Sequence, residues 1–327
     1  MIRPTDISIV VQGAVSPDTI RVVQQLQRNF CGAEIIISTW LGSDLKGIYV
    51  EKIVQSDDPG CVVADFVTQT MNNINRQLVS TKAGIAVATR PFILKTRTDI
   101  VFHSADFLKY FEKYDAVQST YFRNRLLLCN YYTRNPRVFG TCFHPSDWIL
   151  FGRAEDIRTY YNSIPLMPEE EGGWFLNHPK DSTFFTNYIC RYTPEQHIFL
   201  SFLNKKQNVH CSCYYDRTPK MIIETECAFA ECFVVLDYQN QIKITFPKYN
   251  PNRYLEKHTL ISHWQWKALY MHYCKSTPSI LWFFYLIRSH FLVFWSTLRT
   301  ICVLILDRLN LKETVKKILS TKQKKQH

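Results

Sequence analysis

Residues 92–99 read Phe-Ile-Leu-Lys-Thr-Arg-Thr-Asp, a short apolar strand that ends by presenting Lys95, Arg97 and Asp99 in alternation. In α/β sheets, ligands bind beyond the carboxyl ends of the strands. Cations at such an end suit a phosphorylated ligand, and a carboxylate beside them suits a metal ion bound with it. A solvated strand end with an ion pair would give the same pattern, so the flanking segments have to distinguish the two.

The strands predicted before this segment also end in polar residues. They are predicted at 7–11, 34–37 and 49–54. Their ends read Gln12-Gly13, Ser38-Thr39-Trp40 and Gln55-Ser56-Asp57-Asp58-Pro59-Gly60. Several neighbouring strands therefore present hydrogen-bonding groups at one edge of the predicted sheet.

A helix is predicted over 18–29, with Ser16 as its cap and Pro17 near its start. Strand, helix and strand imply a parallel pair with a crossover connection. The order is that of a mononucleotide-binding half, and the fold class is an α/β mixed sheet flanked by helices. A Gly-x-Gly-x-x-Gly fingerprint is absent, which disfavours a dinucleotide site.

Composition indicates a globular protein of 327 residues with 46% apolar and 14% aromatic residues. The eleven cysteines are an odd number without a Cys-x-x-Cys pair, so reduced, mostly buried thiols are expected. The first residues lack the apolar run of a signal peptide. A cytoplasmic location is therefore expected.

The net charge of +11 is concentrated at the end of the chain, because residues 308–327 carry seven Lys and Arg residues and one Glu. Binding to nucleic acid is not expected, since no stripe of basic and aromatic residues crosses the folded body. Residues 280–306 are apolar but interrupted by Arg288, His290 and Arg299, which favours an interfacial helix over a spanning one. With the basic tail, it is expected to bind an anionic membrane surface. A helix packed on the protein's own core is the alternative.

The segment 65–88 is predicted to be a helix rich in amides and hydroxyls, with Arg76 as the first choice for a diphosphate contact and Gln77 beside it. These amides would either bind a ligand or satisfy the strand ends in a buried network. Residues 123–135 form a strand-like run flanked by basic and amide groups.

Two later segments supply candidate chemistry. In Phe143-His144-Pro145-Ser146-Asp147-Trp148, the residues His144, Asp147 and Trp148 can together bind a metal, accept a proton or stack a sugar, although a Pro-Ser-Asp turn is also ordinary. Residues 165–181 have the composition of a mobile lid. Thr193-Pro194-Glu195 starts a helix, where Glu195 either stabilises the helix or acts as a general base.

Taken in order, these motifs resemble the WavE family of lipopolysaccharide-synthesis proteins, over about residues 5 to 270. The motifs that carry the resemblance are Val10-Val-Gln-Gly13, Ile37-Ser-Thr-Trp40, Asp58-Pro-Gly60, Asn75-Arg-Gln77 with Ser80-Thr81, Lys95-Thr-Arg-Thr-Asp99, Thr133-Arg-Asn-Pro136 and Phe143-His-Pro-Ser-Asp-Trp148. The resemblance implies a GT-A-like glycosyltransferase that acts on surface-glycan precursors at the inner face of the cytoplasmic membrane. It would use a nucleotide-sugar donor and a lipid-linked or core oligosaccharide acceptor.

The resemblance also implies roles for particular residues. The donor site would comprise Gln12, Gly13, Thr39, Trp40, Asp57, Arg76, Gln77, Lys95, Arg97 and Asp99. His144 and Trp148 would contact the acceptor, and Glu195, or otherwise Asp147, would be the catalytic base. Asp99 and His263 would bind Mn²⁺ or Mg²⁺. The Asp-x-Asp metal motif of such enzymes reads Arg97-Thr98-Asp99 here, and this departure puts metal dependence in doubt because a cation could stabilise the leaving group instead.

The predicted organisation is one GT-A-like domain over 1–275 and a membrane-associated segment over 276–327. A non-catalytic glycan-binding or assembly protein with the same fold is the alternative of a different class. A methyltransferase is disfavoured because a glycine-rich first loop is not evident.

Overall fold

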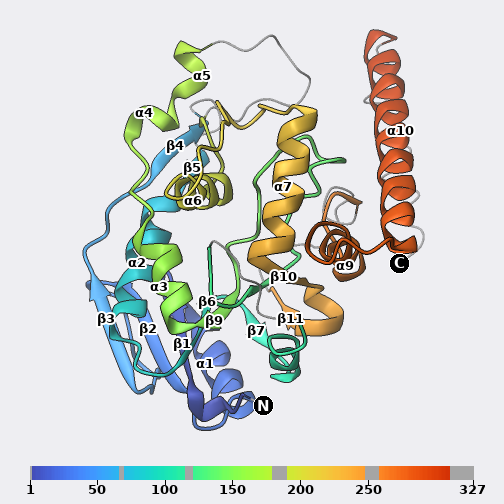
Figure 1. Cartoon of the computed structure of the whole chain (residues 1–327). Helices are drawn as coiled ribbons and strands as arrows, with labels where there is room; N and C mark the ends of the chain where they lie inside the picture. The colour runs from blue at the N-terminus through green and yellow to red at the C-terminus, as the bar shows by residue number, and fades with distance from the viewer. Residues whose placement is uncertain (1, 66–69, 115–120, 179–189, 247–257, 310–327) are drawn as a thin grey trace, which may run out of the picture. The chain divides into compact units, whose positions relative to one another are not determined.

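A computed structural model describes residues 2–65, 70–114, 121–178, 190–246 and 258–309 (Figure 1). The chain divides into two compact units, Met1–Trp282 and Phe283–His327. The first unit contains the sheet and its helices, and the described part of the second unit, residues 283–309, belongs mainly to a long helix that begins at Ile280.

The central feature of the first unit is a seven-stranded sheet in the order β10-β8-β9-β6-β1-β2-β3. Strands β3, β2, β1 and β6 are mutually parallel, whereas β9 runs antiparallel to both of its neighbours, β6 and β8. Two short pairs, β4 with β5 and β7 with β11, lie outside this sheet. The strands are β1 Ile7–Gln12, β2 Glu34–Trp40, β3 Lys52–Ser56, β4 Val62–Asp65, β5 Thr70–Asn72, β6 Phe92–Arg97, β7 Val101–Phe102, β8 Leu126–Cys129, β9 Leu150–Arg153, β10 Phe233–Leu236 and β11 Ile244–Thr245.

Helices flank this sheet, which confirms the predicted mixed α/β class (Figure 1). The helices are α1 Pro17–Asn29, α2 Ile74–Val87, α3 Ala154–Asn162, α4 Glu169–Gly172, α5 Trp174–Asn177, α6 Pro194–Leu203, α7 Pro219–Cys232, α9 His263–Leu269 and α10 Ile280–Arg308. Every residue of β1 is buried, as expected for a strand covered on both faces.

Helix α2 packs closely on β1 and β2 because of one glycine. A Cβ atom at Gly84 would lie 2.4 Å from Val10 Cγ1 and 3.1 Å from Ser38 Cβ. The absence of a side chain at Gly84 lets the helix approach the two strands. This packing sets the height of the first turn of α2 over the carboxyl ends of the strands.

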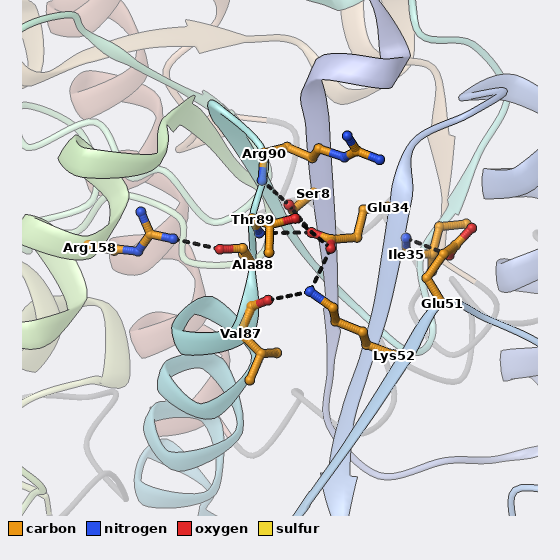
Figure 2. A network of polar contacts seen from close by, with 10 residues as sticks. All are labelled: Ser8, Glu34, Ile35, Glu51, Lys52, Val87, Ala88, Thr89, Arg90 and Arg158. Atoms are coloured by element: carbon orange, nitrogen blue, oxygen red, sulfur yellow. Dashed lines mark hydrogen bonds and ion pairs between the residues drawn. The ribbon is translucent and has the colours of Figure 1, made fainter.

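A polar network forms around the buried carboxylate of Glu34 at the opposite, amino end of the sheet (Figure 2). The carboxylate of Glu34 accepts hydrogen bonds from Ser8 Oγ, from Thr89 N at 2.9 Å and from Thr89 Oγ1 at 2.8 Å, and it pairs with Lys52 Nζ at 2.7 Å. Lys52 Nζ also donates to the carbonyl of Val87 at 2.8 Å. The network therefore joins three parallel strands to the connection between α2 and β6.

The predicted helix over 65–88 is wrong in its first part, because β4 and β5 precede α2. Asn72 Oδ1 accepts a hydrogen bond from Ile74 N at 3.0 Å, and this turn starts the helix at Ile74. The amides at 72–77 therefore lie at the entrance of α2. Residues 66–69 lie outside the described residues.

Other predicted bounds also shift. The third strand is Lys52–Ser56, and the strand-like run 123–135 contains only β8, because the chain turns at Tyr132 with φ +69°. The predicted lid contains α4 and α5 in its described part, up to residue 178, and its remaining residues lie outside the described residues. The predicted start of α6 is confirmed, since Thr193 Oγ1 accepts a hydrogen bond from Gln196 N at 3.1 Å.

Helix α10 provides most of the described part of the second unit. Its segment Ile280–Arg299 has a mean hydropathy of 1.3 and is, by length and composition, able to cross a membrane. Large apolar side chains are exposed along this helix. They include Phe283, Phe284, Ile287, Phe291, Phe294, Trp295, Leu298, Ile301 and Ile305. Most of the basic tail, residues 310–327, lies outside the described residues.

Candidate functional site

A cavity of about 610 Å³ lies at the carboxyl ends of the parallel strands. Its lining residues are Gln12, Gly13, Ala14, Trp40, Asp58, Asn73, Arg76, Gln77, Arg97, Thr98 and Asp99. Strands β2 and β3, which follow β1 in the chain, lie on one side of β1, and β6 lies on its other side. The strand order therefore reverses between β1 and β6. Such a reversal is the usual ligand site of open α/β sheets.

The cavity floor is built by the ends of β1 and β6, where Gln12 and Arg97 are directly paired. Gly13 follows with φ +118°, a conformation that favours glycine, and its N–H donates to the carbonyl of Ser38 at 3.0 Å. Thr98 Oγ1 donates to the carbonyl of Ala14 at 2.8 Å. These bonds hold the backbone of both strand ends against the cavity.

Arg76 projects from the first turn of α2 and is held by an aspartate from the loop after β3. Its Nε donates to Asp58 Oδ1 at 2.8 Å and its Nη2 to Asp58 Oδ2 at 2.7 Å. Arg76 Nη1 donates to Asn73 Oδ1 at 3.0 Å. The hydrogen bonds from Arg76 lower the pKa of Asp58, so this carboxyl is ionised at neutral pH.

Arg97 forms a similar two-point pair with Asp99, with Nε–Oδ1 at 2.9 Å and Nη2–Oδ2 at 2.8 Å. Its guanidinium lies 4.4 Å from the ring centre of Trp148, which also stacks on Tyr132 at 5.3 Å. Trp148 is only 4% exposed. The ring of Trp148 is thus covered by Arg97 and Tyr132 in this structure, and its contact with an acceptor sugar stays a prediction.

Gln77 connects the cavity to a buried group of ionisable residues. Its Nε2 donates to Asp147 Oδ2, and the backbone carbonyl of Asp147 accepts a hydrogen bond from Lys95 Nζ. Lys95 is fully buried and does not line the cavity, so its predicted contact with a diphosphate is not supported. Burial lowers the pKa of Lys95 to about 8, and the charge of Asp147 opposes that shift.

Glu195 and His144 form the deeper part of this group. Glu195 Oε2 lies 3.5 Å from His144 Nε2, and His144 Nδ1 lies 3.0 Å from the carbonyl of Tyr132, so Nδ1 is the protonated nitrogen. Burial raises the pKa of Glu195 to about 8, and the charge of Asp147 adds to it. Burial and then Arg134 lower the pKa of His144 to about 3. At neutral pH the pair is thus neutral, and neither residue lines the cavity.

The nucleotide-binding residues predicted on the second and third strands are only partly brought to the cavity. Trp40 lines it, whereas Thr39 is fully buried with its hydroxyl 3.1 Å from Ser43 Oγ. Asp58, and not the predicted Asp57, reaches the cavity. The Asp58-Pro-Gly60 turn, in which Asp58 Oδ1 accepts a hydrogen bond from Gly60 N at 2.9 Å, is the sequence signal that could have identified Asp58 as the carboxylate that lines the cavity.

The predicted metal ligands do not come together. His263 Nδ1 lies 2.8 Å from the carbonyl of Val235 and Nε2 lies 3.0 Å from Tyr114 Oη, so both ring nitrogens are bonded within the protein. Both oxygens of Asp99 bond to Arg97. Among the described residues no group of three or more His, Cys, Asp or Glu side chains could hold a metal ion. Both side chains expected to bind Mn²⁺ or Mg²⁺ are thus bonded to protein groups in this structure, and their role as metal ligands stays a prediction.

Comparison with known proteins shows a family whose model covers most of the chain. The model of a family described as WavE lipopolysaccharide synthesis matches residues 7–296. No curated protein is significantly similar to the chain. Among solved structures, a Drosophila beta-1,4-galactosyltransferase 7 mutant in complex with manganese, UDP-Gal and xylobiose is similar, with 12% identity and a TM-score of 0.24. That similarity covers 47% of this chain and about half, 51%, of the other, and its TM-score is too low to assign an activity.

Proposed function

The chain belongs to the WavE lipopolysaccharide synthesis family, and we propose that it is a glycosyltransferase that moves a sugar from a nucleotide-sugar donor to a surface-glycan acceptor. The observation that carries this proposal is the pair of guanidinium groups, Arg76 and Arg97, at the carboxyl ends of the strands where their order reverses. Guanidinium groups bind phosphate oxygens through two parallel hydrogen bonds. The cavity thus has the position expected for a diphosphate site and holds two guanidinium groups that can bind one.

In the proposed reaction, the acceptor hydroxyl oxygen bonds to the anomeric carbon while the bond from that carbon to the diphosphate oxygen breaks. Negative charge develops on the leaving diphosphate, and Arg76 and Arg97 stabilise it. We assign this stabilisation to the two guanidiniums because the carboxylate and imidazole expected to hold a metal ion are bonded to other groups. Gln12, Gly13, Trp40 and Gln77 complete the proposed donor site.

A base takes the proton of the acceptor hydroxyl, and Asp147 and Glu195 are the candidates. Asp147 is one hydrogen bond from the cavity, through Gln77. Glu195 has to lose its proton first, because its pKa is raised to about 8. Both carboxylates are covered, so acceptor binding has to open a path to the one that reacts. His144 holds Glu195 and is proposed to support it rather than to bind the acceptor.

The acceptor is proposed to be a lipid-linked or core oligosaccharide at the cytoplasmic membrane face. The exposed apolar side chains of α10 and the +6 charge of residues 308–327 support binding to an anionic lipid surface. The domain from 1 to 275 would then act on a glycan held at the membrane by its own lipid. The membrane segment is proposed to begin near residue 276.

Titration calorimetry with UDP-, GDP-, CMP- and dTDP-sugars, with products identified by mass spectrometry, tests the proposal. We expect one nucleotide class to bind, and Arg97→Ala to weaken that binding at least about tenfold. Arg158→Ala is the control, because Arg158 donates to the carbonyl of Ala88 at 2.7 Å and does not line the cavity. Binding of a glycan without any nucleotide-sugar binding would instead identify a glycan-binding protein.

A further inference from the structure

The cavity that would receive a diphosphate already contains its own anions. Its charged lining residues are Arg76, Arg97, Asp58 and Asp99, and each arginine is bonded through two nitrogens to one aspartate. The formal charges of these four residues cancel. A phosphate entering the cavity therefore meets guanidiniums whose hydrogen-bonding edges are occupied by carboxylates.

The two pairs are held differently. Arg97 and Asp99 are two residues apart at the end of one strand, and Asp99 is 11% exposed. Asp58 and Arg76 are 18 residues apart, and the side chain of Asp58 is 41% exposed. In the described part of the chain, the partners of the Asp58 carboxylate are Arg76 and the N–H of Gly60 in its own turn. Asp58 can thus leave Arg76 without breaking the sheet.

The position of the Asp58 pair gives it a second effect. Asp58 precedes β4 and Arg76 follows β5, so their ion pair joins the two ends of the β4–β5 strand pair beside the cavity. Separation of the pair frees the turn at 58–60 from α2. Arg76 would keep its bond to Asn73 Oδ1 at 3.0 Å, which holds the guanidinium near the cavity.

We propose that Asp58 is an internal competitor for the phosphate site at Arg76, so that a diphosphate binds by taking the place of the Asp58 carboxylate. The proposal rests on the proposed function of the cavity as a nucleotide-sugar site. One charged pair breaks and another forms, and Asp58 turns to water. The exchange lowers the affinity for every phosphate that replaces Asp58 by up to the free energy of the lost ion pair, and a diphosphate that also reaches Arg97 gains a second charged contact.

Asp58→Asn tests this competition. The asparagine oxygen can still accept the Gly60 N–H, but the neutral amide cannot replace the two-point carboxylate contact with Arg76. Calorimetry with pyrophosphate and with UDP, in buffer containing EDTA, should show binding about fivefold tighter than in the wild-type chain, since an exposed ion pair contributes up to ~1 kcal/mol. Asp44→Asn is the matched control, because Asp44 is exposed and makes the same bond to the N–H two residues on, Lys46, at 3.0 Å. The control should leave the affinity within about twofold.

Each outcome bears on a separate claim. Weaker or equal binding by Asp58→Asn, with wild-type binding intact, overturns the competition and leaves the proposed function standing. Tighter binding without sugar transfer supports the competition and contradicts the transferase. If pyrophosphate and UDP bind neither the wild-type protein nor Asp58→Asn, the competition is contradicted. The proposed transferase function then still stands, because another nucleotide class could serve as donor. A far-UV spectrum and melting temperature for each variant exclude misfolding, and Asp58→Ala, which has no side-chain acceptor at all, should also bind more tightly if it folds.

Discussion

Replacement of Glu34 by glutamine should destabilise the fold without touching the cavity. Burial alone would raise the pKa of Glu34, but hydrogen bonds from Lys52, Ser8 and Thr89 outweigh it and lower the pKa from 4.5 to about 2 (Figure 2). This lowering of the pKa corresponds to about 3 kcal/mol of stability at neutral pH. The side chain of Lys52 is 35% exposed, so water screens part of this contribution, and we expect a loss of about 2 kcal/mol.

The loss should depend on pH with a defined sign. The folded pKa of Glu34 lies below its unfolded value, so its ionisation stabilises the protein fully above about pH 4.5, and this stabilisation disappears as the pH falls toward 2. The glutamine variant lacks the titrating group. Its deficit in unfolding free energy should therefore be largest near neutral pH and should shrink in acid.

Urea denaturation followed by circular dichroism, at about pH 7 and about pH 3, measures both quantities. Glu51→Gln is the matched control, because Glu51 is an exposed carboxylate on the same edge and accepts one hydrogen bond from Ile35 N at 2.8 Å, which glutamine can keep. Its free energy of unfolding should change by less than about 0.5 kcal/mol. A Glu34→Gln deficit that is the same at both pH values, or no larger than that of the control, would refute the reasoning.

Two other predictions concern the deeper residues and the last helix. The pKa of Glu195 is raised to about 8, so the free energy of unfolding should fall as the pH rises from about 4.5 to 8 and Glu195 loses its proton. Urea denaturation of Glu195→Gln should show that this fall is absent. An unchanged dependence of the unfolding free energy on pH would contradict the prediction. The double variant Phe291→Asp and Phe294→Asp should sediment less with anionic vesicles than the wild-type protein. Ile223→Asp, at an exposed apolar position of α7, is the control and should sediment like wild type. Equal sedimentation of the wild type, the double variant and the control would contradict membrane binding through α10.

The sequence predicted the edge of the sheet at which the cavity lies because strand periodicity and polar strand ends are local features. Gln12, Gly13, Arg76 and Arg97 all line the cavity as predicted, since each lies within two residues of a strand end or in the first turn of a helix. Local patterns could not show which of two adjacent polar residues, such as Asp57 and Asp58, points into the cavity. For this reason the sequence pattern points to Asp57, whereas Asp58 is the residue that lines the cavity.

The predictions for Trp148 and His263 depend on features that lie outside local sequence patterns. Both residue types have chemistry that suits a ligand, and both are bonded here to groups far away in the sequence: Trp148 to Arg97, and His263 to Val235 and Tyr114. Those partners are brought together only by the tertiary fold. Sequence reasoning gives the capacity of a side chain, and the structure shows whether that capacity is already satisfied.

The charged groups at the two ends of the sheet differ in burial, and therefore in what they contribute to stability and to binding. At the amino end, Glu34 is buried beneath four donors, so its charge stabilises the fold and offers nothing to a ligand. At the carboxyl end, Asp58 and Arg76 remain more than a third exposed, so their pair adds little stability and can be exchanged. Stability and binding should therefore separate by mutation. Glu34→Gln should lower the free energy of unfolding with unchanged phosphate affinity, and Asp58→Asn should raise phosphate affinity with little change in that free energy.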